Sequence, residues 1–180
     1  MQDKRARFEA QVLPHLDAAH RLARWLARTP GDADDVVQEA FLRAFRAFDS
    51  LRGPDARAWL LAIVRNCHLS ALTERRRRAH EPLGEEHEAE AQAASARLPD
   101  PERDLLERDA RRTLERLIAS LPPEHREVLL LRELEDMSYR EIATVTAVPI
   151  GTVMSRLARA RAALKVSGLE ESRGGPRAVR

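Results

Sequence analysis

Residues 138–165 read SYREIATVTAVPIGTVMSRLARARAALK, and this stretch decides the fold of the C-terminal part of the chain. Ser138 can cap a helix through its hydroxyl, and Glu141, three residues later, can return a hydrogen bond to the capping residue, as in a capping box. Pro149 has no amide proton and disfavours helical angles at the residue before it, so the first helix has to end there. A second helix is then predicted from about Ile150. The stretch therefore predicts a helix-turn-helix.

The second helix of this pair has one apolar side and one polar side. Its apolar positions recur at spacings of four, three and four residues, the period of a helix lying on a core: Val153, Leu157, Ala160 and Leu164. The opposite side is small or polar near the start of the helix and basic further along: Gly151, Thr152, Met154, Ser155, Arg156 and Arg159. A recognition helix has this character, because its first turns enter the major groove of DNA while arginines reach bases or phosphates. The alternative is an ordinary helical hairpin with a solvated arginine side.

Composition favours helices throughout the chain. Of 180 residues, 4% are aromatic and only seven are glycine, so we expect an all-α fold without a β-sheet. The formal net charge is +2 although 33% of the residues are charged, so any electrostatic function depends on how the charges are arranged. Cys67 is the single cysteine, which excludes an internal disulfide, and no apolar run approaches the roughly 20 residues of a membrane span. The N-terminus lacks the apolar core of a signal peptide, and we expect a cytoplasmic protein.

The strongest helical pattern of the N-terminal half is DADDVVQEAFLRAFRAF, residues 32–48. Its acidic start suits the positive end of a helix dipole, and Thr29-Pro30-Gly31 before it predict a turn. Apolar side chains at helical spacing are expected in a core: Val36, Val37, Ala40, Phe41, Ala44, Phe45 and Phe48. The other side of this helix carries Asp35, Gln38 and Glu39, which are either solvated or contact a partner.

Residues 49–54 are expected to form a loop, because Gly53-Pro54 cannot lie inside a helix, and Asp55 can cap the helix that follows. That helix ends in an arginine run: Arg75, Arg76, Arg77 and Arg78. A run of this kind beyond the apolar part of a helix indicates either a solvated surface or a contact with a polyanion, and the residues alone do not decide between the two.

Residues 79–104 are rich in Glu, Ala, Pro and Ser and lack apolar anchors, which predicts a flexible acidic linker. Its histidines, His80 and His87, are interpreted as polar linker residues, because a metal site needs ligands that converge on a rigid frame. We expect neither a metal nor a cofactor. The linker separates two small helical domains, predicted at residues 5–78 and 105–165, and residues 166–180 are expected to be a mobile tail.

Two parts of the chain resemble the sigma-70 family of transcription initiation factors. DVVQEAFLRAFRAF, residues 35–48, followed by AWLLAIVRN, residues 58–66, resembles region two of that family, and residues 121–161 resemble region four. Because no separate middle domain lies between them, the chain resembles the compact extracytoplasmic-function (ECF) group. The resemblance implies a protein that binds core RNA polymerase, directs promoter recognition and opening, and is not an enzyme. An anti-sigma factor is a further implied partner.

The resemblance also implies roles for individual residues. Binding to the clamp helices of RNA polymerase is implied for Asp35, Gln38, Glu39 and Phe41. Contacts with the minus-ten element are implied for Ser50, Leu51, Arg52, Gly53 and Asn66, and a carboxamide such as that of Asn66 can bond the edge of an unstacked base. Contacts with the minus-thirty-five element are implied for Thr152, Met154, Ser155, Arg156, Ala158 and Arg159. Phosphate contacts are expected from Tyr139 and from Arg75, Arg76, Arg77 and Arg78.

The chain departs from the family pattern at three positions. Leu51 stands where an aromatic residue is common, so it cannot stack on an unpaired base as a ring would. Met154 stands where a basic residue is frequent, and Ala147 replaces the glycine that is common in such turns.

Three other functions compete with this interpretation. A sigma-like decoy that sequesters an anti-sigma factor has no need of the arginines on the recognition helix, and a stand-alone repressor leaves residues 35–41 without a role. An enzyme is disfavoured, because the histidines are scattered and neither a glycine-rich phosphate loop nor a carboxylate pair occurs.

The linker leads to an expectation about the free chain. We expect it to bind promoters poorly, because a polar linker cannot fix the spacing of the two domains. The linker glutamates could also occupy the arginine run, and the apolar faces of the domains could pack together and hide DNA-binding residues.

Overall fold

The computed structural model describes residues 2–27, 29–51, 53, 55–79 and 112–173, and these residues form helices and turns without a strand. The predicted all-α fold is confirmed. The expectations for Arg52, for the linker histidines and for the linker glutamates fall outside the described residues.

The N-terminal bundle, residues 2–79, is built from α1 (Gln2–Val12), the 3₁₀ helix η1 (Leu13–His15), α2 (Leu16–Leu26), α3 (Pro30–Ala47), the 3₁₀ helix η2 (Phe48–Ser50) and α4 (Ala56–Ala79). Helices α2, α3 and α4 pack against one another. Their facing sides bury the apolar residues that the helical spacing predicts, among them Val37, Leu60 and Val64. This packing fixes the position of α4, which carries both Asn66 and the arginine run.

An aromatic cluster joins α1 to the end of α3. The ring of Phe8 meets the rings of Phe41, Phe45 and Phe48 edge to face, with centroids 6.3, 5.2 and 5.4 Å away. Edge-to-face contacts add to the apolar burial, because the positive ring edge meets the negative ring face. The cluster thereby fixes the segment that leads into the loop after η2.

The start of α3 differs from the prediction of a turn at Thr29-Pro30-Gly31. Thr29 is the capping residue, and its Oγ1 accepts a hydrogen bond from the backbone N–H of Asp32 at 3.1 Å. Pro30 takes the first helical position, where a backbone N–H would have no partner within the helix, so its missing N–H costs no hydrogen bond. The prediction for Asp55 is confirmed, because its Oδ1 accepts a hydrogen bond from the N–H of Ala58 at 2.9 Å.

The C-terminal bundle, residues 112–173, contains a helix at residues 112–120 followed by α6 (Pro123–Glu133), α7 (Tyr139–Thr146) and α8 (Ile150–Arg173). The predicted capping box at α7 is present, with the Glu141 N–H donating to Ser138 Oγ at 3.2 Å and the Ser138 N–H donating to Glu141 Oε2 at 2.6 Å. Ala147 ends α7 in the left-handed region, at φ 54°. Helix α8 continues beyond Lys165, the predicted end of the domain, to Arg173.

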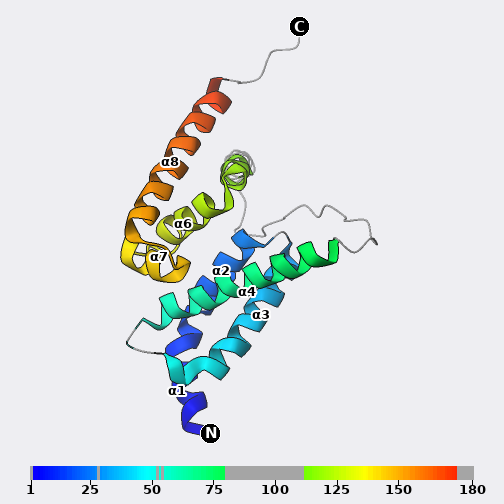
Figure 1. Ribbon diagram of the computed structural model, residues 1–180, viewed down its shortest axis with the longest axis vertical. Helices are drawn as coiled ribbons and strands as arrows, with labels where there is room; N and C mark the ends of the chain where they lie inside the picture. Colours follow the sequence, from blue (N-terminus) through cyan, green and yellow to red (C-terminus); the bar gives the residue numbers. More distant parts are fainter. Residues whose placement is uncertain (1, 28, 52, 54, 80–111, 174–180) are drawn as a thin grey trace, which may run out of the picture.

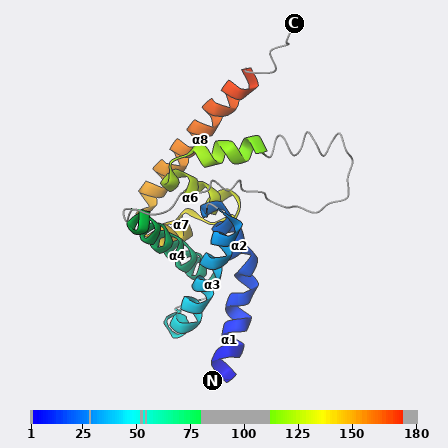
Figure 2. The same cartoon turned by 90° about the vertical axis from the view of Figure 1, so that its right-hand side faces the viewer.

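The two bundles pack against each other. Helix α7 lies on α4, and α6 contacts α2, as Figures 1 and 2 show from two directions. The buried apolar side chains of both bundles form one continuous core. From this contact α8 runs away from the N-terminal bundle, so that the start of α1 and the end of α8 lie at opposite ends of the molecule (Figure 1). None of the helices in the described part of the chain is long and apolar enough to cross a membrane.

Candidate nucleic-acid interface

Helix α8 presents the predicted recognition face. Val153, Leu157 and Ala160 are buried against the bundle, as their spacing predicts. The opposite side of the helix is open: Met154 is 53% exposed, and Ser155, Ala158 and Arg159 are exposed as well. Thr152 and Arg156 are half-buried at the edges of this face. The first turns of α8 therefore present small, apolar and basic side chains on the side of the helix that faces away from the core.

The packing of the two bundles does not hide this face, which corrects the expectation that closure would cover the DNA-binding residues. The contact between the bundles is made by α7 and α6, whereas the open side of α8 points elsewhere. Arg156 alone lies near the contact, where its charge acts on Glu127 of α6. Any effect of the packing on DNA binding must come from where it places the two bundles.

Tyr139, a predicted phosphate contact, is half-buried at the start of α7. Its ring lies under the guanidinium of Arg132, 5.6 Å from the centroid. The neighbouring Arg161 of α8 forms an ion pair with Glu133 at 2.8 Å. The basic residues behind the recognition face are therefore held in place by partners within the C-terminal bundle.

The residues predicted to contact the minus-ten element lie on two segments of the N-terminal bundle. Ser50 is exposed as the last residue of η2, so the predicted loop of residues 49–54 is helical at its start. Gly53 is exposed in the loop that follows and has φ 83°, an angle that residues with side chains rarely adopt. Leu51 is half-buried and packs on the core, so its side chain holds the loop against the bundle and is not fully available to a ligand. Asn66 is exposed on α4, and its carboxamide is available to a ligand.

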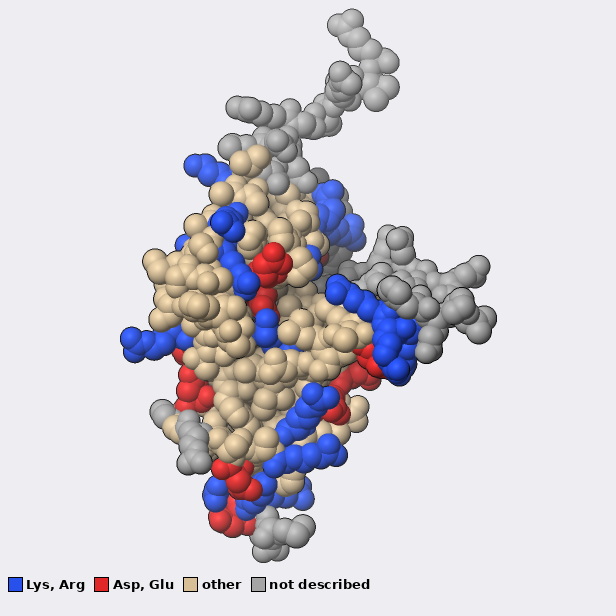
Figure 3. Space-filling model, in the orientation of Figure 1, with Lys and Arg blue, Asp and Glu red and all other residues tan. Residues whose placement is uncertain are grey.

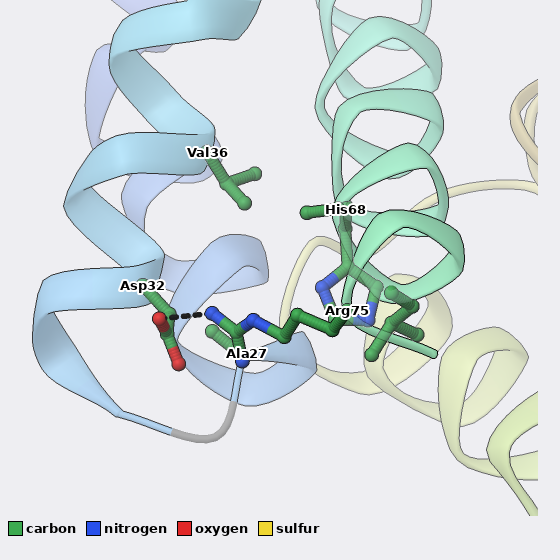
Figure 4. Close-up of a pocket in the computed structure, with 7 residues that line it drawn as sticks. Ala27, Asp32, Val36, His68 and Arg75 are labelled. Atoms are coloured by element: carbon green, nitrogen blue, oxygen red, sulfur yellow. Dashed lines mark hydrogen bonds and ion pairs between the residues drawn. The ribbon is translucent and has the colours of Figure 1, made fainter. Parts of the chain in front are cut away.

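The arginine run at the end of α4 is engaged by acidic side chains. Arg75 forms an ion pair with Asp32 at the start of α3, and Figure 4 shows its side chain reaching across from α4. Arg77 and Arg78 both contact Glu74, at 2.9 and 3.0 Å. In Figure 3 these basic side chains form a blue patch at the end of α4. Their partners come from α3 and α4 themselves, so the sequence interpretation in terms of linker glutamates missed the nearer carboxylates.

A small pocket lies beneath Arg75, lined by Ala27, Asp32, Val36 and His68 (Figure 4). Its volume is about 10 Å³, room for about one water molecule. Burial, together with the charge of Arg75, lowers the pKa of His68 below its ordinary value of 6.5. Burial alone would raise the pKa of Asp32, but hydrogen bonds from Arg75 and Thr29 outweigh it and the pKa is lowered. The pocket is too small for an organic ligand.

No cluster of three or more His, Cys, Asp or Glu that could hold a metal occurs among the residues that the structure describes. Cys67 is buried, and burial raises the pKa of its thiol.

The predicted polymerase-binding strip runs along α3. Asp35 and Gln38 are exposed, whereas Glu39 is half-buried and pairs with Arg43 at 2.6 Å. Phe41 is half-buried in the aromatic cluster.

The strip continues with apolar side chains that the sequence analysis missed. Leu42 is 49% exposed, and Phe45, which was expected in the core, is 40% exposed. The spacing of Phe45 suits burial, but its ring remains partly exposed beside the ring of Phe8 and the ammonium of Lys4, which lies 5.5 Å from its centroid. An apolar patch beside charged residues is the usual character of a protein-binding surface.

Ion pairs between the bundles were also missed. Glu135, in the turn between α6 and α7, is bound by Arg21 of α2 and Arg57 of α4. Glu127 of α6 is bound by Arg65 of α4. Burial raises the pKa of Glu127, and the charge of Arg65 opposes this shift only in part. These partners are 62 to 114 residues apart in sequence, and no local pattern reports such a pairing.

Residues 12–78 match the model for sigma-70 region 2, and residues 111–164 match the model for sigma-70 region 4. The chain is 40% identical to the ECF RNA polymerase sigma-E factor of Escherichia coli K12 over 151 residues, 81% of this chain and 79% of that protein. It is 38% identical to the RNA polymerase sigma-H factor of Pseudomonas aeruginosa over 169 residues, 90% and 86% of the two chains.

Solved structures show the same likeness. The sigma factor RpoE of Bartonella quintana, in complex with the anti-sigma factor NepR, superposes with a TM-score of 0.73 at 27% identity, over 89% of this chain and 95% of that one. CnrH in complex with the cytosolic domain of CnrY gives a TM-score of 0.61 at 27% identity, over 92% and 88%. The likeness extends over both bundles, and together with the family matches it shows that this chain belongs to the sigma-70 family, in its ECF group.

Proposed function

We propose that the chain binds core RNA polymerase through the α3 strip and directs it to promoters through two DNA-binding surfaces. The observation that carries this proposal is that α8 offers an open recognition face while α3, in the same chain, offers a mixed polar and apolar strip. A stand-alone repressor would need only the first of these surfaces. Such a protein acts by binding, and it works in the cytoplasm, where its polymerase and DNA partners are.

The two DNA surfaces have different tasks. The open face of α8, with Ser155, Ala158 and Arg159, suits readout of the minus-thirty-five element in the major groove of duplex DNA. The loop after η2 and Asn66 both belong to the N-terminal bundle and suit capture of an unpaired base in the minus-ten element, because a carboxamide can both donate and accept hydrogen bonds. Arg76, Arg77 and Arg78, near the end of α4, suit phosphates.

An anti-sigma factor is the further partner that we propose. The sigma factor of Bartonella quintana that resembles this chain was solved in complex with the anti-sigma factor NepR. The exposed Leu42 and Phe45 beside the α3 strip provide apolar area that a regulator competing with polymerase would cover.

Reconstituted transcription tests the proposal. Purified core RNA polymerase is incubated with the chain and a pool of random DNA, and bound fragments are selected and then transcribed. We expect fragments with two elements at a constant spacing and transcripts starting at one position. A chain that selects the same DNA equally well without polymerase would be a stand-alone regulator, and a chain that binds an anti-sigma factor but never supports transcription would be a decoy.

A further inference from the structure

Glu135 is the most enclosed charged side chain at the contact between the two bundles, with 1% of its side chain exposed. Arg21 binds both carboxylate oxygens, with Nε 2.8 Å from Oε1 and Nη2 2.9 Å from Oε2. Arg57 donates to Oε2 at 2.7 Å and also to the backbone carbonyl of Glu135. A carboxylate of the C-terminal bundle is thus held by two arginines of the N-terminal bundle, which we call the Glu135 clamp.

The turn that carries Glu135 is shaped for this contact. The next residue, Asp136, has φ 46°, in the left-handed region, and its own side chain is 95% exposed. The turn therefore places one carboxylate inward and its neighbour outward. Inside the clamp, hydrogen bonds from the two arginines replace the hydrogen bonds that the Glu135 carboxylate would make to water. Hydrogen bonds between charged groups are stronger than neutral ones, and the contact with Arg21 is bidentate. Without the arginines its burial would be strongly unfavourable, so the contact depends on both sides.

A second pair lies along the same contact. Arg65 of α4 binds the buried carboxylate of Glu127 of α6. Arg57 and Arg65 lie eight residues apart on α4, about two helical turns, and both belong to the helix that carries Asn66. The helix predicted to capture the minus-ten element is therefore the one to which the C-terminal bundle is fastened.

This closed arrangement is too short for a promoter, an argument that rests on the proposed function. The two elements lie roughly 25 base pairs apart by their names, which at about 3.4 Å per base pair is about 85 Å of DNA. Helix α4 has 24 residues and is therefore about 36 Å long. Because α7 lies directly on α4, the start of α8 is within about one helix length of Asn66. Both elements can be contacted together only if the bundles separate.

We propose that the Glu135 clamp holds the free chain closed and must open before the two promoter elements can be bound at once. The clamp couples the bundles without covering the recognition face, so a closed chain can still touch a single element. Core polymerase, by binding each bundle at its own site, would stabilise the open form. The Bartonella sigma factor, which superposes on 89% of this chain, was solved in complex with an anti-sigma factor.

The distance between the bundles in solution tests this directly. Spin labels are placed on the full chain through Arg46→Cys on α3 and Ser120→Cys in the C-terminal bundle, both exposed positions outside the clamp, while Cys67 stays buried and unlabelled. In the parent we expect one narrow distance distribution. Glu135→Gln, which keeps the shape but removes the charge, should add a broad population at longer distance. Arg21→Gln, which removes the charge on the side of the N-terminal bundle, should add the same population at longer distance. Because the Arg21 side chain is half-exposed, its replacement should not unfold the protein.

Glu133→Gln is the matched control. It removes the same charge two residues away, from a carboxylate that pairs with Arg161 inside the C-terminal bundle. This variant should keep the parent's distances. If the parent is closed ten to one, the Glu135→Gln chain should bind core polymerase up to about tenfold more tightly than the parent, since a polymerase that engages both bundles favours the open form.

The outcomes separate the clamp from the function. Unchanged distances in both Glu135→Gln and Arg21→Gln, or a parent that is already broad, would overturn the clamp. Distances that lengthen as expected in a chain that directs no transcription with core polymerase would support the clamp and refute the promoter function.

Discussion

Replacing Ala147 by glycine should stabilise the protein. Ala147 ends α7 with φ 54° and ψ 39°, a left-handed conformation in which its Cβ crowds the following carbonyl. That crowding costs about 1–2 kcal/mol for a residue other than glycine. Glycine removes it but adds about 0.4–1 kcal/mol of conformational entropy to the unfolded chain. The net gain in unfolding free energy should be about 0.5–1 kcal/mol.

Thermal unfolding followed by circular dichroism measures this gain. For a chain of 180 residues a gain of this size raises the Tm by about 1–4 °C. Ala162→Gly, at an exposed position inside α8, is the matched control and should lower the stability by about 1 kcal/mol, because a helix interior gains nothing from glycine's freedom. If both substitutions lower the Tm by similar amounts, the argument from backbone strain at Ala147 is refuted.

Three further predictions concern binding and pH. Arg159→Ala should weaken promoter binding by about 1–3 kcal/mol and relax sequence preference, whereas neutralising Arg75–Arg78 should lower the affinity for all sequences and flatten the salt dependence of binding. Binding assays on promoter DNA and random DNA over a salt series distinguish the two effects. Equal losses on both DNAs for both changes would contradict the assignment. Asn66→Ala should leave polymerase association intact but reduce strand separation in permanganate footprinting, and full opening by this variant would remove Asn66 from the site. Because the pKa of His68 is lowered in the folded state, the unfolded chain binds more protons below about pH 6.5, and the unfolding free energy should fall as the pH drops through that value. The fall should be smaller in His68→Gln. Denaturant titrations of both chains at pH 7 and 5.5 check this, and equal losses in the two chains would be the contrary result.

The elements with local signals could be predicted from the sequence. The capping box of Ser138 and Glu141 and the cap at Asp55 involve partners three residues apart, and both were found as expected. The apolar spacing of α8 likewise predicted which side of the helix is buried and which is exposed, because the apolar positions of a helix with period 3.6 lie on one side.

Features that depend on distant partners could not be predicted. Thr29-Pro30-Gly31 reads as a turn, yet the same residues can cap and start a helix, and only the packing of α3 decides between the two. The sequence around Glu135 does not indicate that this residue is buried, because the arginines that enclose it lie on α2 and α4. Phe45 has core spacing, but its exposure depends on which side chains of other helices cover its ring, and the spacing does not report them.

The aromatic cluster around Phe8 has a practical consequence for the design of fragments. The span that matches the region 2 model starts at residue 12, after most of α1. A fragment cut there would lose Phe8, and removing a buried phenylalanine costs about 3–5 kcal/mol. It would also uncover the rings of Phe41 and Phe48, which contact Phe8 in the whole chain. Fragments of the N-terminal bundle made for crystallisation or interaction screening should therefore begin no later than Gln2, or their apparent affinity for hydrophobic partners will reflect the exposed rings.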